Sequence, residues 1–490
     1  MSRIVLLTFS LVCLFGCTER STNESMVSQS RFDWIYQVDS LIMPFWMTQE
    51  AIGNPVGNFP AYRYSDGSII DSGNINYDVL NPAFTQYYMS NTDSLRRDFL
   101  RVKSRMIYGY CIAFHLTGNE DYLVIAKLAL DFLIDQGAFV ENSAITFWDV
   151  EGNAHPDILQ RNSQDLAYAL LGPTTYFYLT GDVEVLKMIM RIHEFTWEKY
   201  YEQSDLKENT KLMKWVLEDF EDDKANAKDL IGPMDQLNAY LVLLARMAPD
   251  SLATELNNRS RILDYSLNDN FYSEDYNLFW GRLDNKTFDA PNTDFGHSIK
   301  TFWMIYVAAK LTGDEGLEDF AEKGARRLFS TAYRENGSWY SKYKNDSLKK
   351  DPAILGFQYM ELDQMAATLS FSDTSIYSQY LKYTYPYFEK NLLDYGALTA
   401  DGEPISFGFK VGWFAGNFHN MEHALIGYLS TANYHNDDII LYYAFANDPI
   451  KEKIQPYHYD ADIVDLISSE FQDSNLDGLT KTTVTFRNIR

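Results

Sequence analysis

The chain has 490 residues, of which 46% are hydrophobic, so it can bury a large core. Length alone allows about two to four ordinary domains or one large helical barrel. The formal net charge is −26, from 42 basic and 68 acidic residues. A chain this acidic excludes nucleic acid as the expected partner, because it repels phosphates. It also disfavours an acidic polymer unless a local basic pocket holds it.

The N-terminus resembles a bacterial lipoprotein signal. Arg3 precedes an apolar run that is too short to span a bilayer and that ends in the sequence LFGC. We expect residues 1–17 to be a signal that ends at Cys17 and is cut before it, so that the thiol carries lipid. Residues 18–40 then form a polar tether and lead-in segment. The expected location is periplasmic or on the outer membrane or cell surface, with the lipid as the only membrane contact; a plain secretory signal is the alternative.

The expected processing of the chain leaves too few cysteines for a disulfide or for a zinc site built on thiolates. Cys13 leaves with the signal and Cys17 is acylated, which leaves Cys111 as the single cysteine of the mature chain. Neither an intramolecular disulfide nor a zinc site built on thiolates is then possible. Cys111 lies in the apolar run YGYCIAF, where we expect a core residue rather than a nucleophile.

Three similar stretches predict helical hairpins. In each, an apolar helix ends in Leu-Thr-Gly, an Asn or Asp follows, and a second, amphipathic helix begins. The glycine suits the left-handed position after the first helix, and the Asn or Asp suits the N-cap of the second. The three pairs are Gly118–Asn119, Gly181–Asp182 and Gly313–Asp314.

The spacing of these turns predicts a repeat. Further turn signals lie near residues 249, 373 and 433, and the six turns recur at intervals of roughly 60 to 70 residues. Six sequential hairpins that bury their faces against each other form one (α/α)6 barrel, which we place at residues 41–449. This all-α fold explains the size of the chain better than several small domains.

Residues 450–490 differ in composition and form a C-terminal extension. The stretch 480–489 alternates like a β-strand and is expected to pair with 457–467. Residues 473–478 mimic the start of a calcium loop, but Val484 occupies the twelfth position, where a bidentate Glu is needed. We therefore expect a turn there rather than a calcium site.

Six polar side chains lie at one height along the first helices of the hairpins. Since a helix rises ~1.5 Å per residue, they occupy a level within roughly 8 Å. The six are Arg105, Gln164, Asp235, His297, Glu361 and His419. Most follow long aromatic loops, in which Trp148 and Trp413 are the expected platforms for a sugar ring. The pattern predicts a barrel mouth that binds a polar ligand with apolar faces.

His297 and His419 are the candidates for chemistry among the eight histidines. Neither lies beside a Ser or Cys in a known nucleophile elbow, and no phosphate loop or HExxH metal pair is present. Two imidazoles facing one cavity suit proton transfer, because a pKa near ~6.5 lets one take a proton while the other gives one. For a reducing sugar, Arg105 and Lys300 would hold the enediolate oxygen.

Four stretches, taken in order, resemble one family. They are SRMIYGYCIAFHLTGNEDYL with Arg105, the Gln-containing helix after FWDVEGN, GHSIKTFW with His297, and FKVGWFAGNFHN with His419. Together they are similar to the N-acylglucosamine 2-epimerase superfamily, which includes cellobiose 2-epimerases and mannose isomerases. The resemblance implies an (α/α)6 barrel that interconverts C2 epimers of aldoses, or aldoses and ketoses. It further implies that the two histidines are the catalytic pair and that no metal or other cofactor takes part.

The chain departs from this family at several supporting positions. The family's Glu three residues after the first His is Lys300 here, a cation on the same helix face that should lower the pKa of His297 or hold an anionic sugar substituent. Asp235 stands where many members carry a further His, and Asn162 replaces a common Tyr. These changes suggest a different substrate, a different isomerisation or lost activity.

The sequence therefore predicts a sugar epimerase or isomerase for a reducing mono- or oligosaccharide, with His297 and His419 as the acid and base. The residues expected to bind the sugar are Arg105, Lys300, Asp235, Gln164, Glu361, Asp363, Trp148 and Trp413. One alternative is a glycoside hydrolase or lyase that uses Asp235 with Glu361 or Asp363. Another is a glycan-binding lipoprotein without activity.

Overall fold

The computed structural model describes most of the chain from residue 32 to its end. The residues left out are 1–31, 72, 81–94, 96, 141, 150, 156–161, 204–210, 218–227, 345–347, 395–396, 406–407, 412–415 and 448–450. The expected signal with Cys17 and the expected platform Trp413 thus lie outside the described residues, and lipid anchoring stays a prediction. Residues Asp33–Arg490 form one compact unit. Within the described part, no helix is both long and apolar enough to cross a bilayer.

Five consecutive hairpins follow the predicted turns. Their first members are α5 (Leu100–Thr117), α7 (Ser163–Thr180), the run of α9 (Ile231–Gln236), η5 (Leu237–Leu241) and α10 (Val242–Met247), α12 (Phe295–Thr312) and α14 (Gly356–Ser370). Their second members are α6 (Glu120–Asp135), α8 (Val183–Tyr200), α11 (Asp250–Phe271), α13 (Glu315–Ala332) and the run of α15 (Thr374–Ile376), η6 (Tyr377–Leu381) and α16 (Lys382–Asn391).

The turn chemistry within these hairpins is as predicted. Gly118, Gly181 and Gly313 have φ values of 70°, 66° and 70°, a left-handed conformation that glycine adopts without a Cβ clash. The N-cap side chain of Asp182 accepts hydrogen bonds from the backbone N–H groups of Glu184 and Val185. Local sequence therefore determines where each hairpin turns.

The first helices form the inner ring of a barrel, which α17 (Phe418–His435) completes. Each inner helix contacts the next, and α17 closes the ring against α5. The inner helices are buried nearly all round, as α12 is, because both the barrel interior and the outer helices cover them. The outer α13 instead buries one face through Leu317, Ala321 and Leu328.

The sixth pair of the barrel is not sequential. Asn436, with φ 54°, ends α17 in the left-handed conformation, and the strand β12 (Ile439–Phe445) follows in place of a second helix. The outer position is filled from the N-terminal side by α1 (Trp34–Tyr36), η1 (Gln37–Ile42) and α2 (Met43–Trp46). The indole Nε1–H of Trp34 donates to Thr431 Oγ1 at 2.9 Å. Part of the expected lead-in segment is thus a wall of the barrel.

The C-terminal extension forms a three-stranded antiparallel sheet in the order β12–β14–β13. β14 (Thr480–Arg487) pairs with β13 (Asp462–Glu470), as predicted, with Ile467 opposite Thr483. Strand β12 lies inside the range that we assigned to the barrel. The predicted calcium-like stretch is a turn around η8 (Ser474–Leu476), in which Asp473 accepts the N–H of Asn475.

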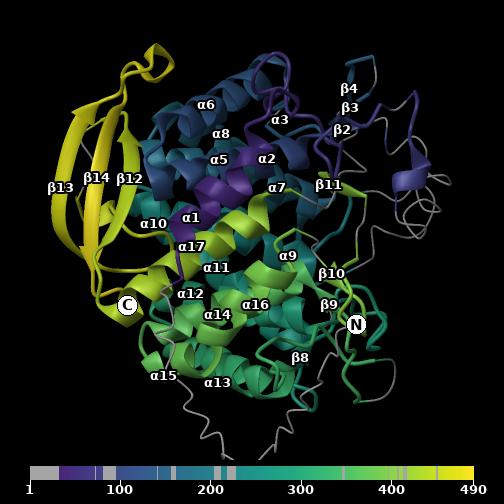
Figure 1. Cartoon of the computed structure of the whole chain (residues 1–490). Helices are drawn as coiled ribbons and strands as arrows, with labels where there is room; N and C mark the ends of the chain where they lie inside the picture. Colours follow the sequence, from purple (N-terminus) through teal and green to yellow (C-terminus); the bar gives the residue numbers. More distant parts are fainter. Residues whose placement is uncertain are drawn as a thin grey trace, which may run out of the picture. The chain divides into compact units, whose positions relative to one another are not determined.

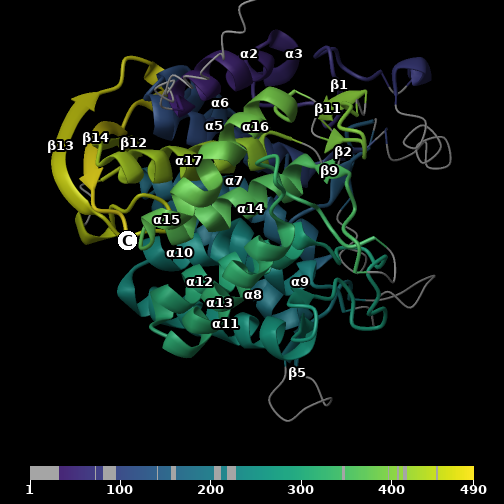
Figure 2. The same cartoon turned by 60° about the horizontal axis from the view of Figure 1, so that its bottom comes forward.

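The sheet and the aromatic loops lie at opposite sides of the helices, as Figure 1 and Figure 2 both show. On the loop side, short strand pairs tie the loops together: β1 (Arg63–Tyr64) with β11 (Phe409–Val411), β2 (Asp98–Phe99) with β3 (Phe147–Trp148) and β4 (Ala154–His155), and β9 (Ile354–Leu355) with β10 (Ala397–Leu398). The remaining short elements are α3 (Gln49–Ile52), η2 (Tyr77–Val79), β5 (Tyr201–Gln203), β6 (Lys211–Met213), β7 (Tyr272–Ser273), β8 (Leu278–Phe279) and η7 (Lys451–Lys453).

Replacing Gly427 tests how the N-terminal helix closes the barrel. A Cβ at Gly427 in α17 would lie 2.2 Å from the ring of Trp34. We expect Gly427→Ala to lower the free energy of unfolding by about 1–3 kcal/mol, because the indole must move. The matched control Gly316→Ala, in α13, meets no atom closer than 3.6 Å and should be stabilising by up to about 1 kcal/mol. Urea unfolding measures both, and a stabilised Gly427→Ala would contradict this packing.

Candidate active site

Four of the six polar side chains predicted at one level are linked by direct contacts, with Lys300 between them. The amide Nε2–H of Gln164 donates to Asp235 Oδ2 at 2.7 Å. The ammonium of Lys300 lies 3.4 Å from Asp235 Oδ1 and 3.4 Å from Glu361 Oε1. Glu361 Oε1 is in turn 3.3 Å from Nδ1 of His419. Glu361 of α14 thus contacts both α12, through Lys300, and α17, through His419.

Lys300 is the counter-ion at the centre of this cluster. Burial lowers the pKa of Lys300, but the negative charge of Glu361 and the further charge of Asp235 outweigh it, so the net pKa is raised. Burial raises the pKa of Asp235, but Lys300 outweighs it and holds that carboxyl below its usual range. Lys300 and Asp235 are therefore both charged, and the ammonium is already neutralised by protein groups.

His297 is paired with Asp294, the N-cap residue of α12. Asp294 Oδ1 accepts the backbone N–H of His297 at 2.8 Å, and its Oδ2 lies 2.6 Å from the ring Nδ1. Burial lowers the pKa of His297, but the charge and hydrogen bond of Asp294 outweigh both burial and Lys300, so the net pKa is raised. Lys300 does act to lower this pKa, as predicted, but the net pKa is raised because the Asp294 carboxylate was not included in the prediction.

His419 has the opposite electrostatic setting. Burial, followed by the positive charges of Lys300 and Arg105, holds its pKa well below the ordinary value. The two imidazoles share one aromatic neighbour, since the ring of Phe357 lies 5.5 Å from that of His297 and 5.8 Å from that of His419. Two imidazoles whose pKa values are shifted in opposite directions therefore flank one ring at the loop end of the barrel.

Arg105, the sixth predicted residue, contacts the cluster through aromatic rings. Its guanidinium lies 3.9 Å from the ring centroid of Tyr168 and 5.9 Å from that of Phe418, the ring above which Lys300 also lies, at 5.7 Å. Its buried Nε has no hydrogen-bond partner in the described part of the chain. A buried guanidinium with an unused donor is suited to binding an oxyanion.

Two predicted binding residues lie elsewhere. Asp363 is fully buried and accepts the indole N–H of Trp339 at 2.8 Å, while its other oxygen lies 3.0 Å from Nε2 of His423. Asp363 therefore supports the core, contrary to expectation, because α14 turns it away from Glu361. Trp148 is only 7% exposed and packs beside Lys103 at 5.9 Å, so it lacks the open face that a sugar platform needs.

Sequence reasoning missed Asp294, Phe357 and Glu422. Asp294 had a usable signal, because an Asp three residues before His297 at a helix start is a typical N-cap. Glu422 lies three residues after His419, on the same helix face. Phe357 carries no local signal, since an aromatic residue at a helix start is usually core.

Three side chains, including His419, form a cluster of the size that could coordinate a metal ion. Donor atoms of Glu361, His419 and Glu422 all fall within 4.8 Å of one another. The Lys300 ammonium, 3.4 Å from the Glu361 oxygen, already supplies a positive charge there. A positive charge so close disfavours a metal cation between these three residues.

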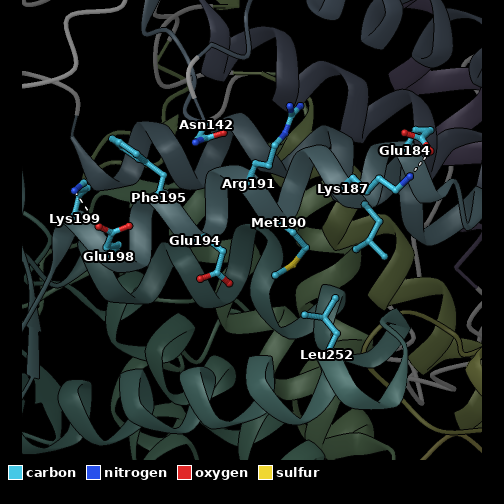
Figure 3. Close-up of a pocket in the computed structure, with 11 residues that line it drawn as sticks. Asn142, Glu184, Lys187, Met190, Arg191, Glu194, Phe195, Glu198, Lys199 and Leu252 are labelled. Atoms are coloured by element: carbon cyan, nitrogen blue, oxygen red, sulfur yellow. Dashed lines mark hydrogen bonds and ion pairs between the residues drawn. The ribbon is translucent and has the colours of Figure 1, made fainter.

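A separate open groove runs along the outer face of α8 (Figure 3). Its apolar lining comes from Met190 and Phe195 of α8 and from Leu252 of α11. Its charges pair with one another, as Lys187 does with Glu184 at 2.7 Å. None of the predicted site residues lines this groove, so the cluster inside the barrel is the candidate site.

Comparison with known proteins supports the fold and the family resemblance. No protein-family profile matches the chain. A cellobiose 2-epimerase of Bacteroides fragilis is 23% identical over 238 residues, which are 47% of this chain and 59% of the relative. A cellobiose 2-epimerase of Eubacterium cellulosolvens is 22% identical over 324 residues, which are 61% of this chain and 71% of the relative. The chain is a distant homologue of the cellobiose 2-epimerases. The predicted resemblance to the N-acylglucosamine 2-epimerase superfamily is confirmed.

Solved structures of this homologous group confirm the predicted (α/α)6 fold. Cellobiose 2-epimerase from Bacillus thermoamylovorans aligns with a TM-score of 0.63 at 16% identity, over 81% of this chain and 97% of its own. A D-mannose isomerase aligns with a TM-score of 0.59 at 13% identity, over 84% and 99%. A GH76 α-1,6-mannanase from Salegentibacter aligns more weakly, with a TM-score of 0.50 at 13% identity, over 82% and 100%. The sequence match to the Bacteroides fragilis relative spans less than two thirds of that protein.

Replacing Lys300 tests the buried charge cluster. In Lys300→Met, Asp235 and Glu361 lose their cation. Burial already raises the pKa of Glu361, which then rises further. Burial, no longer opposed by Lys300, lifts the folded-state pKa of Asp235 above its unfolded value. Stability is then kept at low pH and lost as pH rises. We expect a loss of about 3–5 kcal/mol in unfolding free energy at pH 8 and a clearly smaller loss at pH 5.

The control for this prediction is Lys323→Met, which removes an exposed pair with Asp319 and should change stability by less than about 1 kcal/mol at either pH. Chemical denaturation at both pH values measures the difference. An equal loss at pH 5 and pH 8 in Lys300→Met would show that the two carboxylates are not held charged by Lys300.

Proposed function

We propose that this chain is a sugar epimerase or aldose–ketose isomerase that acts on a reducing mono- or oligosaccharide. The observation that carries the proposal is the pair of imidazoles around Phe357, each with its own carboxylate and with opposite pKa shifts. The distant homology to cellobiose 2-epimerases supports the same class of reaction.

His419 is the proposed base. Nδ1 of His419 lies 3.3 Å from Glu361 Oε1, which favours the tautomer with the proton on Nδ1. The neutral ring then offers the lone pair of Nε2 to the proton on the sugar carbon beside the carbonyl. The C–H bonding electrons then form an enediolate, whose negative oxygen Arg105 is placed to stabilise. Lys300 adds positive charge nearby but remains bound to its two carboxylates.

His297 is the proposed acid. Asp294 keeps its ring protonated, so it can return a proton to the enediolate. A proton returned to the opposite face of the same carbon gives the C2 epimer, and a proton returned to the neighbouring carbon gives the isomer. In both cases one C–H bond is broken and one is formed, so no external oxidant or reductant is needed.

The charges of the cluster favour a neutral sugar. Asp235, Glu361 and Glu422 face Lys300, so the ammonium has no spare charge for an anionic substituent. The contacts therefore support a counter-ion role for Lys300, in place of the expected contact with an anionic sugar substituent.

A second candidate function is glycoside hydrolysis, because the fold also aligns with a mannanase. Asp235 and Glu361 are the available carboxylates, but both are buried against Lys300. Neither is then free to approach a glycosidic bond without breaking that ion pair, so we place hydrolysis second. Glycan binding without turnover is the third outcome that the experiment below distinguishes.

Incubation with reducing mono- and disaccharides in D2O tests the proposed function. We expect deuterium to enter the carbon beside the carbonyl, together with a new epimer or ketose, as detected by NMR and mass spectrometry. His297→Gln and His419→Gln should each lower the exchange rate by about 100-fold or more. His435→Gln, at the far end of the same helix α17, is the matched control and should keep the wild-type rate.

Other outcomes of this experiment would support the two alternative functions, hydrolysis and glycan binding. New reducing ends released from an oligosaccharide without exchange would establish hydrolysis. Saturable sugar binding that survives both histidine changes, with no product from any sugar, would establish a binding protein.

Asp294→Asn tests how His297 is kept protonated. Asparagine still caps the helix, but it removes the negative charge that offsets burial, so the pKa of His297 should fall. Wild-type activity is retained up to the raised pKa of His297 and lost above it. We expect the variant to lose activity at a pH lower by about one unit.

Asp182→Asn, an N-cap change in α8 away from the cluster, is the control for the pH profile. The profile should be measured as the exchange rate between pH 5 and pH 10. If the alkaline limb of Asp294→Asn coincides with that of the wild type, His297 is not the acid.

A further inference from the structure

The segment 454–460, between β12 and β13, enters the barrel from the end opposite to His297 and His419. We call it the floor segment. Its residues Ile454, Tyr457, His458 and Tyr459 are buried. The Tyr459 hydroxyl lies 2.7 Å from Thr368 Oγ1, and Asp460 pairs with Arg246. Thr368 and Arg246 lie towards the C-terminal ends of inner helices. The floor segment therefore closes this end of the barrel.

Tyr457 reaches from this floor towards the candidate site. Its hydroxyl donates to Glu422 Oε1 at 2.8 Å, and the Tyr108 hydroxyl lies 3.2 Å from it. Its backbone N–H donates to the Tyr178 hydroxyl at 2.9 Å. The φ of Tyr457 is 62°, a left-handed conformation that bulky residues avoid unless their surroundings impose it. The fold therefore holds this ring in a demanding conformation that places its hydroxyl against Glu422.

Glu422 is fully buried and lies directly behind the proposed base. Besides Tyr457, it accepts the amide N–H of Gln364 at 2.8 Å and that of Asn238 at 3.5 Å. Its carboxylate lies within 4.8 Å of donor atoms of both Glu361 and His419. A change of charge on Glu422 is therefore felt at His419 with little screening by water.

Two buried carboxyls this close cannot both be charged without a cost. Burial, followed by the charge of Glu361, raises the pKa of Glu422 to about 7. Glu361 has Lys300 at 3.4 Å, whereas Glu422 has no cation at ion-pair distance in the described residues. The proton shared by the pair thus resides on Glu422. The charged or titratable groups that face Glu422 are Lys300 of α12, Glu361 of α14, His419 of α17, Tyr108 of α5, and Tyr457 and Tyr459 of the floor segment.

We propose that Glu422, held in place by Tyr457 of the floor segment, is a positioning residue whose ionisation strengthens His419 as the base. The inference rests on the proposed function, because it assigns a role within that reaction. When Glu422 loses its proton, the negative charge stabilises the imidazolium that forms as His419 takes the proton from the sugar. The C-terminal extension is then part of the active site, although it never contacts the sugar.

The pH dependence of turnover tests this proposal in the full-length chain. Wild-type kcat should rise as pH passes about 7, and Glu422→Gln should lack this rise and turn over roughly tenfold more slowly at pH 8. Tyr457→Phe removes a donor to the carboxylate, so its rise should shift to a pH higher by about one unit. KM should be unchanged in both. The matched control Tyr443→Phe, whose hydroxyl donates to the backbone carbonyl of Gln455 in the same segment, should keep the wild-type profile.

A titration without sugar separates this inference from the proposed function. With ring-labelled histidine, the NMR signal of His419 should show a step near pH 7 that is absent in Glu422→Gln and displaced in Tyr457→Phe. Turnover and His419 signals that are the same in Glu422→Gln as in the wild type would overturn the inference and leave the isomerase proposal intact. If no sugar exchanges deuterium, the isomerase proposal and the catalytic role of Glu422 both fail, and the NMR step still decides whether Glu422 and His419 interact.

Discussion

The candidate site depends on one buried ammonium, that of Lys300, placed between the carboxylates of Asp235 and Glu361. Removing charges from water is unfavourable, and a buried carboxylate stays charged only when a cation or several donors face it. Lys300 supplies that cation for both acids, and it also depresses the pKa of His419. The same charge therefore stabilises the barrel interior and keeps the proposed base free of a proton.

Different structural elements border this cluster at the two ends of the barrel. At the loop end, the first turns of α12 and α17 present His297 and His419 beside Phe357. At the other end, the floor segment fills the barrel and sends the Tyr457 hydroxyl up to Glu422. Because neighbouring inner helices pack side by side, groups from both ends of the barrel lie within a few ångströms of each other. The C-terminal sheet thus anchors a segment that contributes to the site.

Sequence reasoning succeeded where a short stretch determines its own conformation. The turns at Gly118 and Gly313 were predictable because only glycine adopts a left-handed φ there without strain. Sequence reasoning failed where two segments that are distant in the chain could each fill the same outer position of the barrel. The outer helices next to α17 come from the N-terminal residues around Trp34, because the chain after Asn436 continues as strand β12 of the C-terminal sheet. No local pattern states which segment covers which helix.

The sequence by itself determined the hairpin repeat, the acidic character of the chain and the height at which its polar residues lie along the helices, since these follow from composition and helical rise. Only the tertiary structure decided the direction of each side chain and its ionic partner. It turned Asp363 into the core, set Asp294 against His297 and brought Glu422 beside Glu361. Proton affinities depend on charges a few ångströms away, and those neighbours come from helices far apart in the chain.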